Sequence, residues 1–98
     1  MFPVDVRRWG EQECGAQCER SNLLLGWVRC TGRAEHADHW IPWSRGGATT
    51  VHNLVMSCAA HNLHKSNRSP SVWETWWITR RRRTYWVAPF KPGERYLP

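Results

Sequence analysis

The stretch from Asp38 to Asn62, which reads DHWIPWSRGGATTVHNLVMSCAAHN, decides the fold. Asp38 and His39 stand side by side before an apolar turn; Asn53 follows fourteen residues after His39, and Asn62 nine residues after Asn53. Between these polar residues the pattern predicts a loop, then a strand rich in β-branched residues, then the start of a helix. The stretch therefore predicts one metal site built from a hairpin and a helix.

The elements around this stretch follow from local patterns. Residues 34–40 predict the first strand of the hairpin, and residues 49–57 predict the returning strand. The paired glycines Gly46 and Gly47 give the connecting loop backbone freedom. Residues 58–65 predict a short helix. Upstream, residues 1–13, with Pro3, Gly10 and scattered charges, predict an irregular lead-in. The short apolar run 22–29, interrupted by Gly26, predicts a further strand, and no internal repeat is evident.

A capped helix is predicted near the carboxyl end. Ser71 precedes Val72, and Glu74 stands at the third helical position, as in a capping box. Trp73, Trp76 and Trp77 share one helical face, which predicts core packing rather than base stacking. The arginine run 80–83 falls in the last turn, where cations suit the helix dipole. Residues 85–98, with three prolines, predict an extended tail.

The composition suits one small nucleic-acid-binding domain. The chain has 98 residues, a net charge of +6 and a pI of about 9.8. We expect a single domain over residues 1–98, with a motif core at about 14–66 and a basic, Trp-rich helix and tail at 71–98. Twelve arginines against two lysines favour a nucleic-acid partner, because arginine binds phosphate with two hydrogen bonds and stacks on bases.

The cysteine pattern points to a metal rather than to disulfides. The chain starts without a signal-peptide pattern, and no stretch approaches the roughly 18 apolar residues that span a membrane, so we expect a reducing, cytoplasmic compartment. Cys14 and Cys18 are spaced as metal ligands often are, and Cys58 and His61 form a matching pair downstream. Cys30 is either a spare thiol or a ligand in place of Cys14, and the spare thiol is favoured.

Over about the middle half of the chain the sequence resembles the HNH endonucleases of the ββα-metal nuclease superfamily. The matching segments are Ala37 to Pro42, Trp43 to Gly47, His52 to Cys58, and His61 to Asn62. The resemblance implies an α+β fold, with a two-stranded hairpin plus a helix, a structural zinc knuckle and a C-terminal helix.

Matched position by position, His39 resembles the general base of the family and Asp38 its adjacent metal ligand. Asn53 resembles the middle Asn, which braces the loop and orients the His39 backbone. Asn62 stands where the family often has its last His, as a second ligand to the same ion. The implied catalytic ion is Mg²⁺ or Mn²⁺, because carboxylate and amide oxygens are hard ligands.

Many members of the family also carry a structural zinc ion between two cysteine pairs. Here the first pair is widened to Cys14 and Cys18, and the second is Cys58 with His61 in place of the last Cys. The resemblance therefore implies a zinc site with three thiolates and one imidazole, a common ligand set.

The expected function is metal-dependent hydrolysis of DNA phosphodiester bonds, by nicking or by cutting both strands. The resemblance to small free-standing members suggests a phage-type protein acting in a bacterial or phage-infected cell, with packaging proteins such as terminase as partners. The residues expected to contact DNA phosphates are Arg45, Lys65, Arg80, Arg81, Arg82 and Arg83. One alternative is a non-catalytic zinc module that binds nucleic acid. Another is a modification-dependent restriction endonuclease, although 98 residues leave little room for a reader domain.

Overall fold

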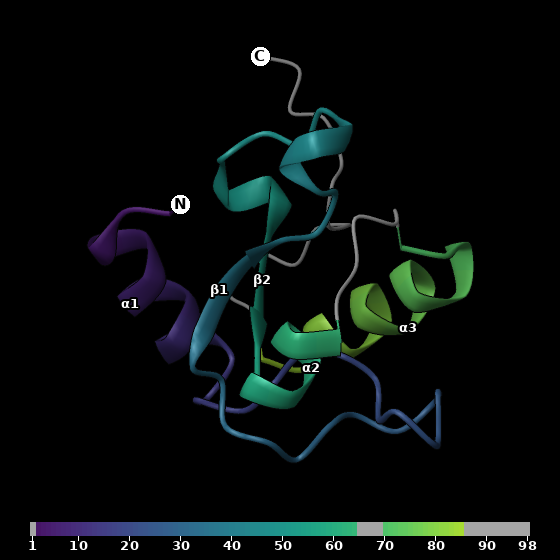
Figure 1. Ribbon diagram of the computed structural model, residues 1–98. Coiled ribbons are helices and arrows are strands. Elements are labelled where there is room, and N and C mark those ends of the chain that lie inside the picture. Colours follow the sequence, from purple (N-terminus) through teal and green to yellow (C-terminus); the bar gives the residue numbers. More distant parts are fainter. Residues whose placement is uncertain (1, 65–69, 86–98) are drawn as a thin grey trace.

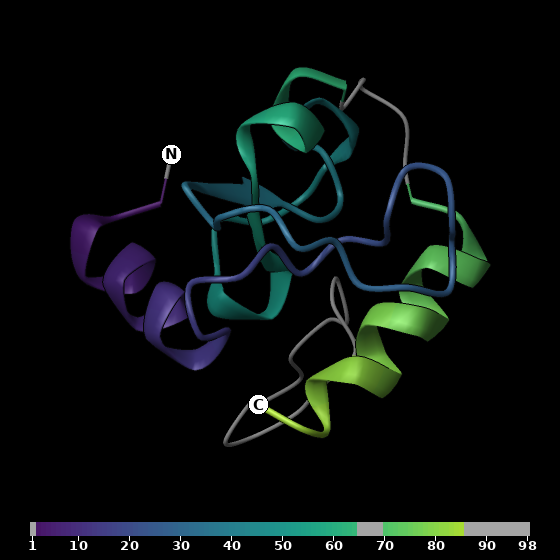
Figure 2. The same cartoon turned by 90° about the horizontal axis from the view of Figure 1, so that it is seen from below.

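The computed structural model describes residues 2–64 and 70–85. An antiparallel hairpin lies at the centre, and α1 and α3 lie on opposite sides of it (Figures 1 and 2). The elements, in order, are α1 (Val4–Glu13), β1 (His36–His39), the 3₁₀ turns η1 (Trp43–Arg45) and η2 (Val51–Asn53), β2 (Leu54–Ser57), α2 (Ala59–His64) and α3 (Val72–Arg82). The predicted α+β class, with a hairpin followed by a helix, is confirmed. None of the helices among these residues has the length and apolar character to cross a bilayer.

The hairpin separates two small apolar clusters. His36 pairs with Ser57 and His39 pairs with Leu54, so the strands are shorter than the predicted 34–40 and 49–57. Alternate residues of β2 face opposite sides of the sheet. Leu54 and Met56 pack on the side of α1 with Phe2, Cys14 and Ala34, whereas Val55 packs with Trp40 and Ile78 of α3. Every residue of β2 is buried as a result.

The predicted irregular lead-in is wrong, because residues 4–13 form α1. Val6, Trp9 and Gly10 occupy one face of this helix, at i, i+3 and i+4, and that face lies against β2. Gly10 permits the close approach, since a Cβ atom there would stand 2.9 Å from a Leu54 methyl carbon and 3.0 Å from the Met56 sulfur. The glycine that argued against a helix is therefore a packing position.

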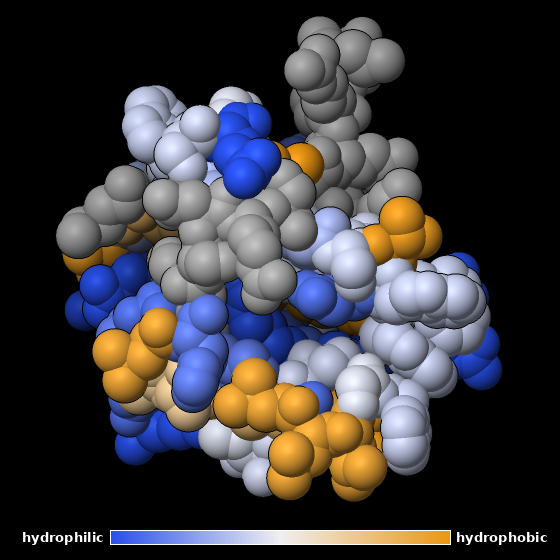
Figure 3. Space-filling view, turned by 45° about the vertical axis from the view of Figure 1, so that its right-hand side comes forward, coloured by the Kyte–Doolittle hydropathy of each residue, from blue (hydrophilic) through white to orange (hydrophobic). Residues whose placement is uncertain are grey.

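The predicted strand at 22–29 is also wrong. Isolated bridges pair Ser21 with Arg29 and Gln17 with Arg33, and the chain between them turns. The Asn22 side chain accepts hydrogen bonds from the backbone N–H groups of Leu24 and Leu25, at 2.8 and 3.1 Å, which fixes a turn instead of a strand. Apolar side chains of this segment are exposed, and apolar residues gather on the lower part of the face in Figure 3.

α3 begins as predicted but buries a different face. The Ser71 hydroxyl accepts a hydrogen bond from the Glu74 N–H at 3.1 Å, so the predicted cap is confirmed. The tryptophan face predicted to pack in the core is largely exposed, with Trp73 at 72% and Trp76 at 46%. Ile78 and Arg82, four residues apart, are the buried residues of the helix. Tyr85 is the only residue of the predicted tail within the described part of the chain.

A buried carboxylate holds α3 against the hairpin. The Glu19 side chain accepts hydrogen bonds from Arg82 Nε at 2.7 Å and Arg82 Nη2 at 3.0 Å. It also accepts from the Tyr85 hydroxyl at 2.8 Å and from the Met56 N–H at 3.0 Å. Arg82 Nη2 further donates to the Leu54 carbonyl oxygen at 2.7 Å. The segment after α1, strand β2 and helix α3 therefore meet at one ion pair.

Arg82→Ala is expected to destabilise the fold by about 3–5 kcal/mol, because it leaves the Glu19 charge buried without its cation. Arg83→Ala is the matched control, since Arg83 is the next residue and is exposed. Urea unfolding followed by tryptophan fluorescence measures both variants. Equal unfolding midpoints for the two would show that the ion pair does not hold α3 in place.

Candidate active site

Asn53 braces the loop that follows His39. Its side chain is buried, and Oδ1 accepts a hydrogen bond from the Ile41 N–H at 2.8 Å. Nδ2 donates to the carbonyl oxygens of Ile41 and Ala48, both at 3.0 Å. A Cβ atom at Gly47 would collide with the Ile41 carbonyl oxygen, so the loop needs glycine there. The Trp40 N–H donates to the Asn53 carbonyl oxygen at 2.7 Å, which fixes the backbone next to His39.

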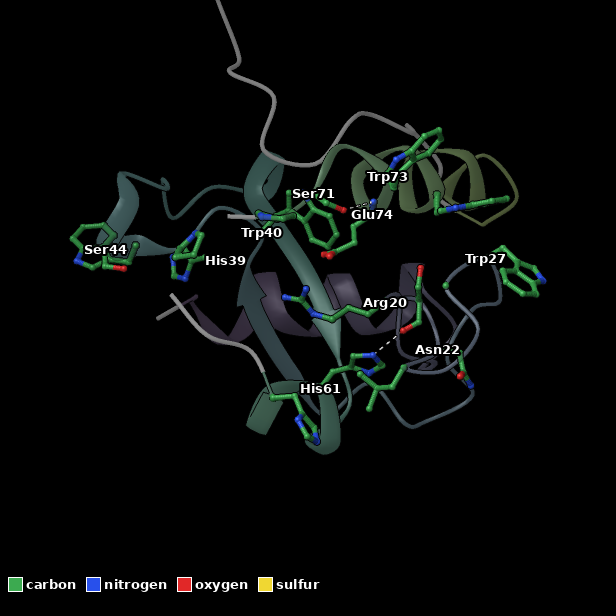
Figure 4. A pocket seen from close by; sticks show the side chains of 18 residues that line it. Arg20, Asn22, Trp27, His39, Trp40, Ser44, His61, Ser71, Trp73 and Glu74 are labelled. Carbon is green, nitrogen blue, oxygen red and sulfur yellow. Dashed lines mark hydrogen bonds between the residues drawn. The ribbon is translucent and has the colours of Figure 1, made fainter. Parts of the chain in front are cut away.

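His39 is held at the end of β1 by contacts that the sequence did not indicate. Its Nε2 lies 2.8 Å from the Thr49 hydroxyl oxygen, across the hairpin loop. The Phe2 ring lies 4.6 Å from the His39 ring, centroid to centroid, and the Trp43 ring 6.4 Å away. The imidazole is half-buried and lines a cleft of about 870 Å³ (Figure 4). Neither Phe2 nor Thr49 belongs to a motif, so only the folded chain reveals them.

Two oxygen donors lie on neighbouring elements. Asp38 is buried in β1, and Asn62 is half-buried in α2, which lies against β1. The Asn62 N–H donates to the Cys58 carbonyl oxygen at 2.9 Å, in the first turn of the helix. A carboxylate and an amide oxygen make a donor set that fits a hard divalent ion such as Mg²⁺ or Mn²⁺.

Three thiols and one imidazole converge beside α2. The ligand atoms of Cys18, Cys30, Cys58 and His61 all lie within 4.8 Å of one another. His61 Nδ1 lies 3.2 Å from Cys58 Sγ and 3.6 Å from Cys18 Sγ, and the Cys30 and Cys58 sulfurs lie 3.9 Å apart. Ligand sulfurs around a tetrahedral zinc ion stand roughly 3.8 Å apart, given Zn–S bonds of about 2.3 Å. The four residues therefore fit a zinc ion.

Outer hydrogen bonds support this ligand set. His61 Nε2 lies 2.8 Å from the Ser21 carbonyl oxygen, to which it can donate, so that Nδ1 faces the thiols as an acceptor. The Gly32 N–H points to Cys30 Sγ at 3.3 Å, and the His61 N–H to Cys58 Sγ at 3.4 Å. N–H groups directed at sulfur favour the thiolate, which is the form that binds a metal.

The expectation that Cys14 joins this group is wrong. Cys14 follows α1 and its side chain enters the apolar cluster with Phe2, Leu54 and Met56, where its thiol donates to the Glu11 carbonyl oxygen at 3.5 Å. Cys30, the alternative, takes the expected place. The Cys30 N–H donates to the Arg20 carbonyl oxygen at 2.9 Å, and this antiparallel pairing brings Cys30 beside Cys18.

The pKa values of the thiols and of the His61 ring suit a site in which a bound cation replaces the thiol protons. Burial raises the pKa of the Cys18 thiol to about 12, so that Cys18 keeps its proton at neutral pH until a cation replaces it. Burial also acts to raise the pKa of Cys58, but hydrogen bonds from the His61 N–H and from the other two thiols outweigh burial and lower it. Burial lowers the pKa of His61, which keeps its ring neutral at pH 7, as a ligand requires.

The arginines predicted to contact DNA differ in exposure. Arg45 in η1, and Arg80 and Arg83 at the end of α3, are exposed. Arg81 is half-buried and donates to the Glu19 carbonyl oxygen at 2.8 Å. Arg82 is fully buried, so the prediction that it contacts DNA is wrong; the Glu19 carboxylate takes its guanidinium instead. Lys65 lies outside the described residues.

The family model for HNH endonuclease matches residues 12–68, more than half of the chain. The chain belongs to the HNH endonuclease family. The match spans the hairpin, α2 and the Cys–His cluster, and the HNH domain suggests a nuclease of the ββα-metal type. No curated protein and no solved structure matches this HNH domain.

Cys30→Ser and Cys14→Ser discriminate between the two possible zinc ligand sets. We expect about one zinc ion per chain in the parent, sharply reduced zinc and a lower melting temperature in Cys30→Ser, and unchanged zinc in Cys14→Ser, because only the Cys30 sulfur lies in the cluster. Native mass spectrometry and thermal melting measure both properties. Zinc lost from Cys14→Ser but kept by Cys30→Ser would contradict the ligand set that the geometry favours.

Proposed function

We propose that this HNH protein hydrolyses phosphodiester bonds of DNA, with His39 as the general base that takes a proton from water. The observation that carries the proposal is the arrangement of His39 on the wall of a cleft, with its ring at hydrogen-bond distance from Thr49 and its backbone next to the Asn53 brace. Histidine is the side chain that most often serves as a general base in enzymes.

The hydrogen bond with Thr49 determines which ring nitrogen of His39 acts as the base. When the Thr49 hydroxyl accepts from Nε2–H, Nδ1 is the basic nitrogen that takes the proton from water. The imidazolium formed in that step keeps the same hydrogen bond, which now joins a cation to a neutral oxygen and is stronger. Thr49 is thus a positioning residue, and Phe2, stacked near the ring, limits its rotation.

Asp38 and Asn62 would hold the divalent ion. When bound there, such an ion would supply positive charge that stabilises the negative charge developing in the transition state. Asn53 acts on the backbone: by fixing Trp40, Ile41 and Ala48 it holds the His39 end of β1 in one position. Basic side chains at Arg45, Arg80 and Arg83 are suited to contact the DNA backbone without reading its sequence, and Lys65 is expected to do the same.

His39→Ala is expected to lower the rate of plasmid cleavage by about 10²–10⁴-fold, because that is what a general base usually contributes. DNA binding, zinc content and melting temperature should stay close to those of the parent. His36→Ala, on the same strand, is the matched control and should cut at the parent rate. Parent-rate cleavage by His39→Ala would exclude His39 as the base. A parent that binds DNA but never cuts it with Mg²⁺ or Mn²⁺ would favour a non-catalytic binding module.

Asp38→Asn and Asn62→Ala are expected to abolish or strongly reduce cleavage across a Mg²⁺ titration while leaving the zinc content unchanged. The physical reason is ligand chemistry: oxygen donors select the hard ion, whereas thiolates and imidazole select zinc. Leu63→Ala, at an exposed position of the same helix, is the control for α2. If Asn62→Ala lost zinc in step with activity, Asn62 and His61 would belong to one shared site.

A further inference from the structure

The cleft beside His39 carries an unusual number of indole rings. It extends from His39 and Ser44 at one end to Trp27 at the other, with Trp40 and Arg20 between them (Figure 4). Within the described part of the chain, five tryptophans line it: Trp27, Trp40, Trp43, Trp73 and Trp77. They come from the turn after Ser21, the end of β1, η1 and α3, so the fold gathers them from segments far apart in the sequence.

Three of these indoles face solvent instead of filling the core. Trp73 and Trp43 are each 72% exposed, and Trp27 is 61% exposed. Trp40 differs: it is buried at the floor of the cleft, and its Nε1 donates to the Thr75 hydroxyl at 3.2 Å. Large aromatic rings that are exposed to solvent around one cleft are typical of a binding surface. Exposed apolar residues without such a role are usually scattered singly over the surface.

Two charged side chains of the described lining, Arg20 and Glu74, can serve the bases of a bound strand. The Arg20 guanidinium lies 5.1 Å from the Trp40 ring centroid, and its Nε donates to the Ser57 hydroxyl at 2.9 Å. Among the described residues that line the cleft, Glu74 is the only carboxylate. The described lining offers several indoles as stacking surface, and Arg20 and Glu74 as hydrogen-bond partners, for the neutral rings of bases.

We propose that this cleft binds unpaired bases of the DNA strand next to the bond that His39 attacks, so that the preferred substrate contains a single-stranded segment. The inference rests on the proposed function, because it assigns the strand in the cleft to the same active site. An indole stacks on the face of a base, and in a duplex those faces are covered by the neighbouring base pairs. An unpaired strand is therefore the form of DNA that these rings can bind.

The net charge of +6 and the position of His39 favour DNA over a partner protein as the occupant. A polyanion is attracted to a basic chain at long range, and its bases then stack in the cleft at short range. The cleft also opens at the proposed general base, so that a strand bound along the indoles brings its backbone to His39.

Binding of a single-stranded oligonucleotide of about 12 nucleotides, compared with a duplex of the same sequence, tests the assignment in the zinc-loaded full chain without Mg²⁺. Trp73→Ala and Trp27→Ala should each weaken single-strand binding by about 5- to 100-fold, as loss of one stacked base does, and change duplex binding by less than about twofold. Trp73→Tyr should restore most of the affinity. Fluorescence anisotropy of a labelled oligonucleotide measures all of these affinities.

Two matched controls come from the same segments. Val72→Ala in α3 and Leu24→Ala in the turn of Trp27 remove exposed apolar groups that do not line the cleft, and they should bind like the parent. Single-strand binding that is unchanged in both tryptophan variants overturns the inference. So does an equal loss of single-strand and duplex binding, because loss of base stacking spares the duplex.

Cleavage with Mg²⁺ separates this inference from the proposed function. The parent should cut a gapped duplex at least about tenfold faster than an intact one, and Trp73→Ala should remove that preference, as loss of one stacked base predicts. Equal cleavage of the two substrates by the parent, with no effect of Trp73→Ala, overturns the cleft assignment and leaves His39 as the base. Indole-dependent binding without cleavage of any substrate overturns the proposed function and leaves the cleft as a binding site.

Discussion

The fold depends on the carboxylate of Glu19, which is buried without access to water. Removing a charge from water costs several kcal/mol, and the cost is offset here by Arg82, by the Tyr85 hydroxyl and by the Met56 N–H. Glu19 directly follows Cys18, so the same short segment anchors α3 and one ligand of the Cys–His cluster. A chain of this size has little apolar area to bury, and buried polar contacts such as these supply part of what a larger core would provide.

Asn53 holds the loop after His39 in place by buried hydrogen bonds, as Glu19 holds the helix α3. Its amide satisfies the N–H and carbonyl of Ile41 and the carbonyl of Ala48, which have no strand partner because the loop bends away from β2. Gly47 leaves room for this amide, since a Cβ atom there would stand 2.8 Å from Nδ2. One polar side chain therefore replaces the backbone hydrogen bonds that a third strand would make, and it fixes the backbone beside His39.

Features set by local patterns could be predicted from the sequence, and features set by distant partners could not. The hairpin, α2 and the cap at Ser71 follow from alternation, turn residues and the spacing to Glu74. In the sequence alone, Gly10 argues against a helix at α1. The close packing of Gly10 against Met56, which accounts for the glycine, is visible only in the folded chain. Arg82 and Cys30 were misassigned for the same reason: the Glu19 carboxylate lies 63 residues from Arg82, and the pairing that brings Cys30 to Cys18 involves a turn without strand periodicity.

The neighbouring positions of His61 and Asn62 couple the two sites. α2 has six residues, and an isolated helix of that length does not persist in water. Its orientation therefore rests on its first turn, where Cys58 and His61 meet Cys18 and Cys30, and where the His61 ring lies at hydrogen-bond distance from the Ser21 carbonyl oxygen. Asn62 is the next residue, so a cation held by the cluster also fixes where the Asn62 amide stands relative to β1. The cluster therefore supports the proposed catalytic site, because Asp38 and Asn62 lie on β1 and α2, which are in contact, and the cluster fixes the orientation of α2.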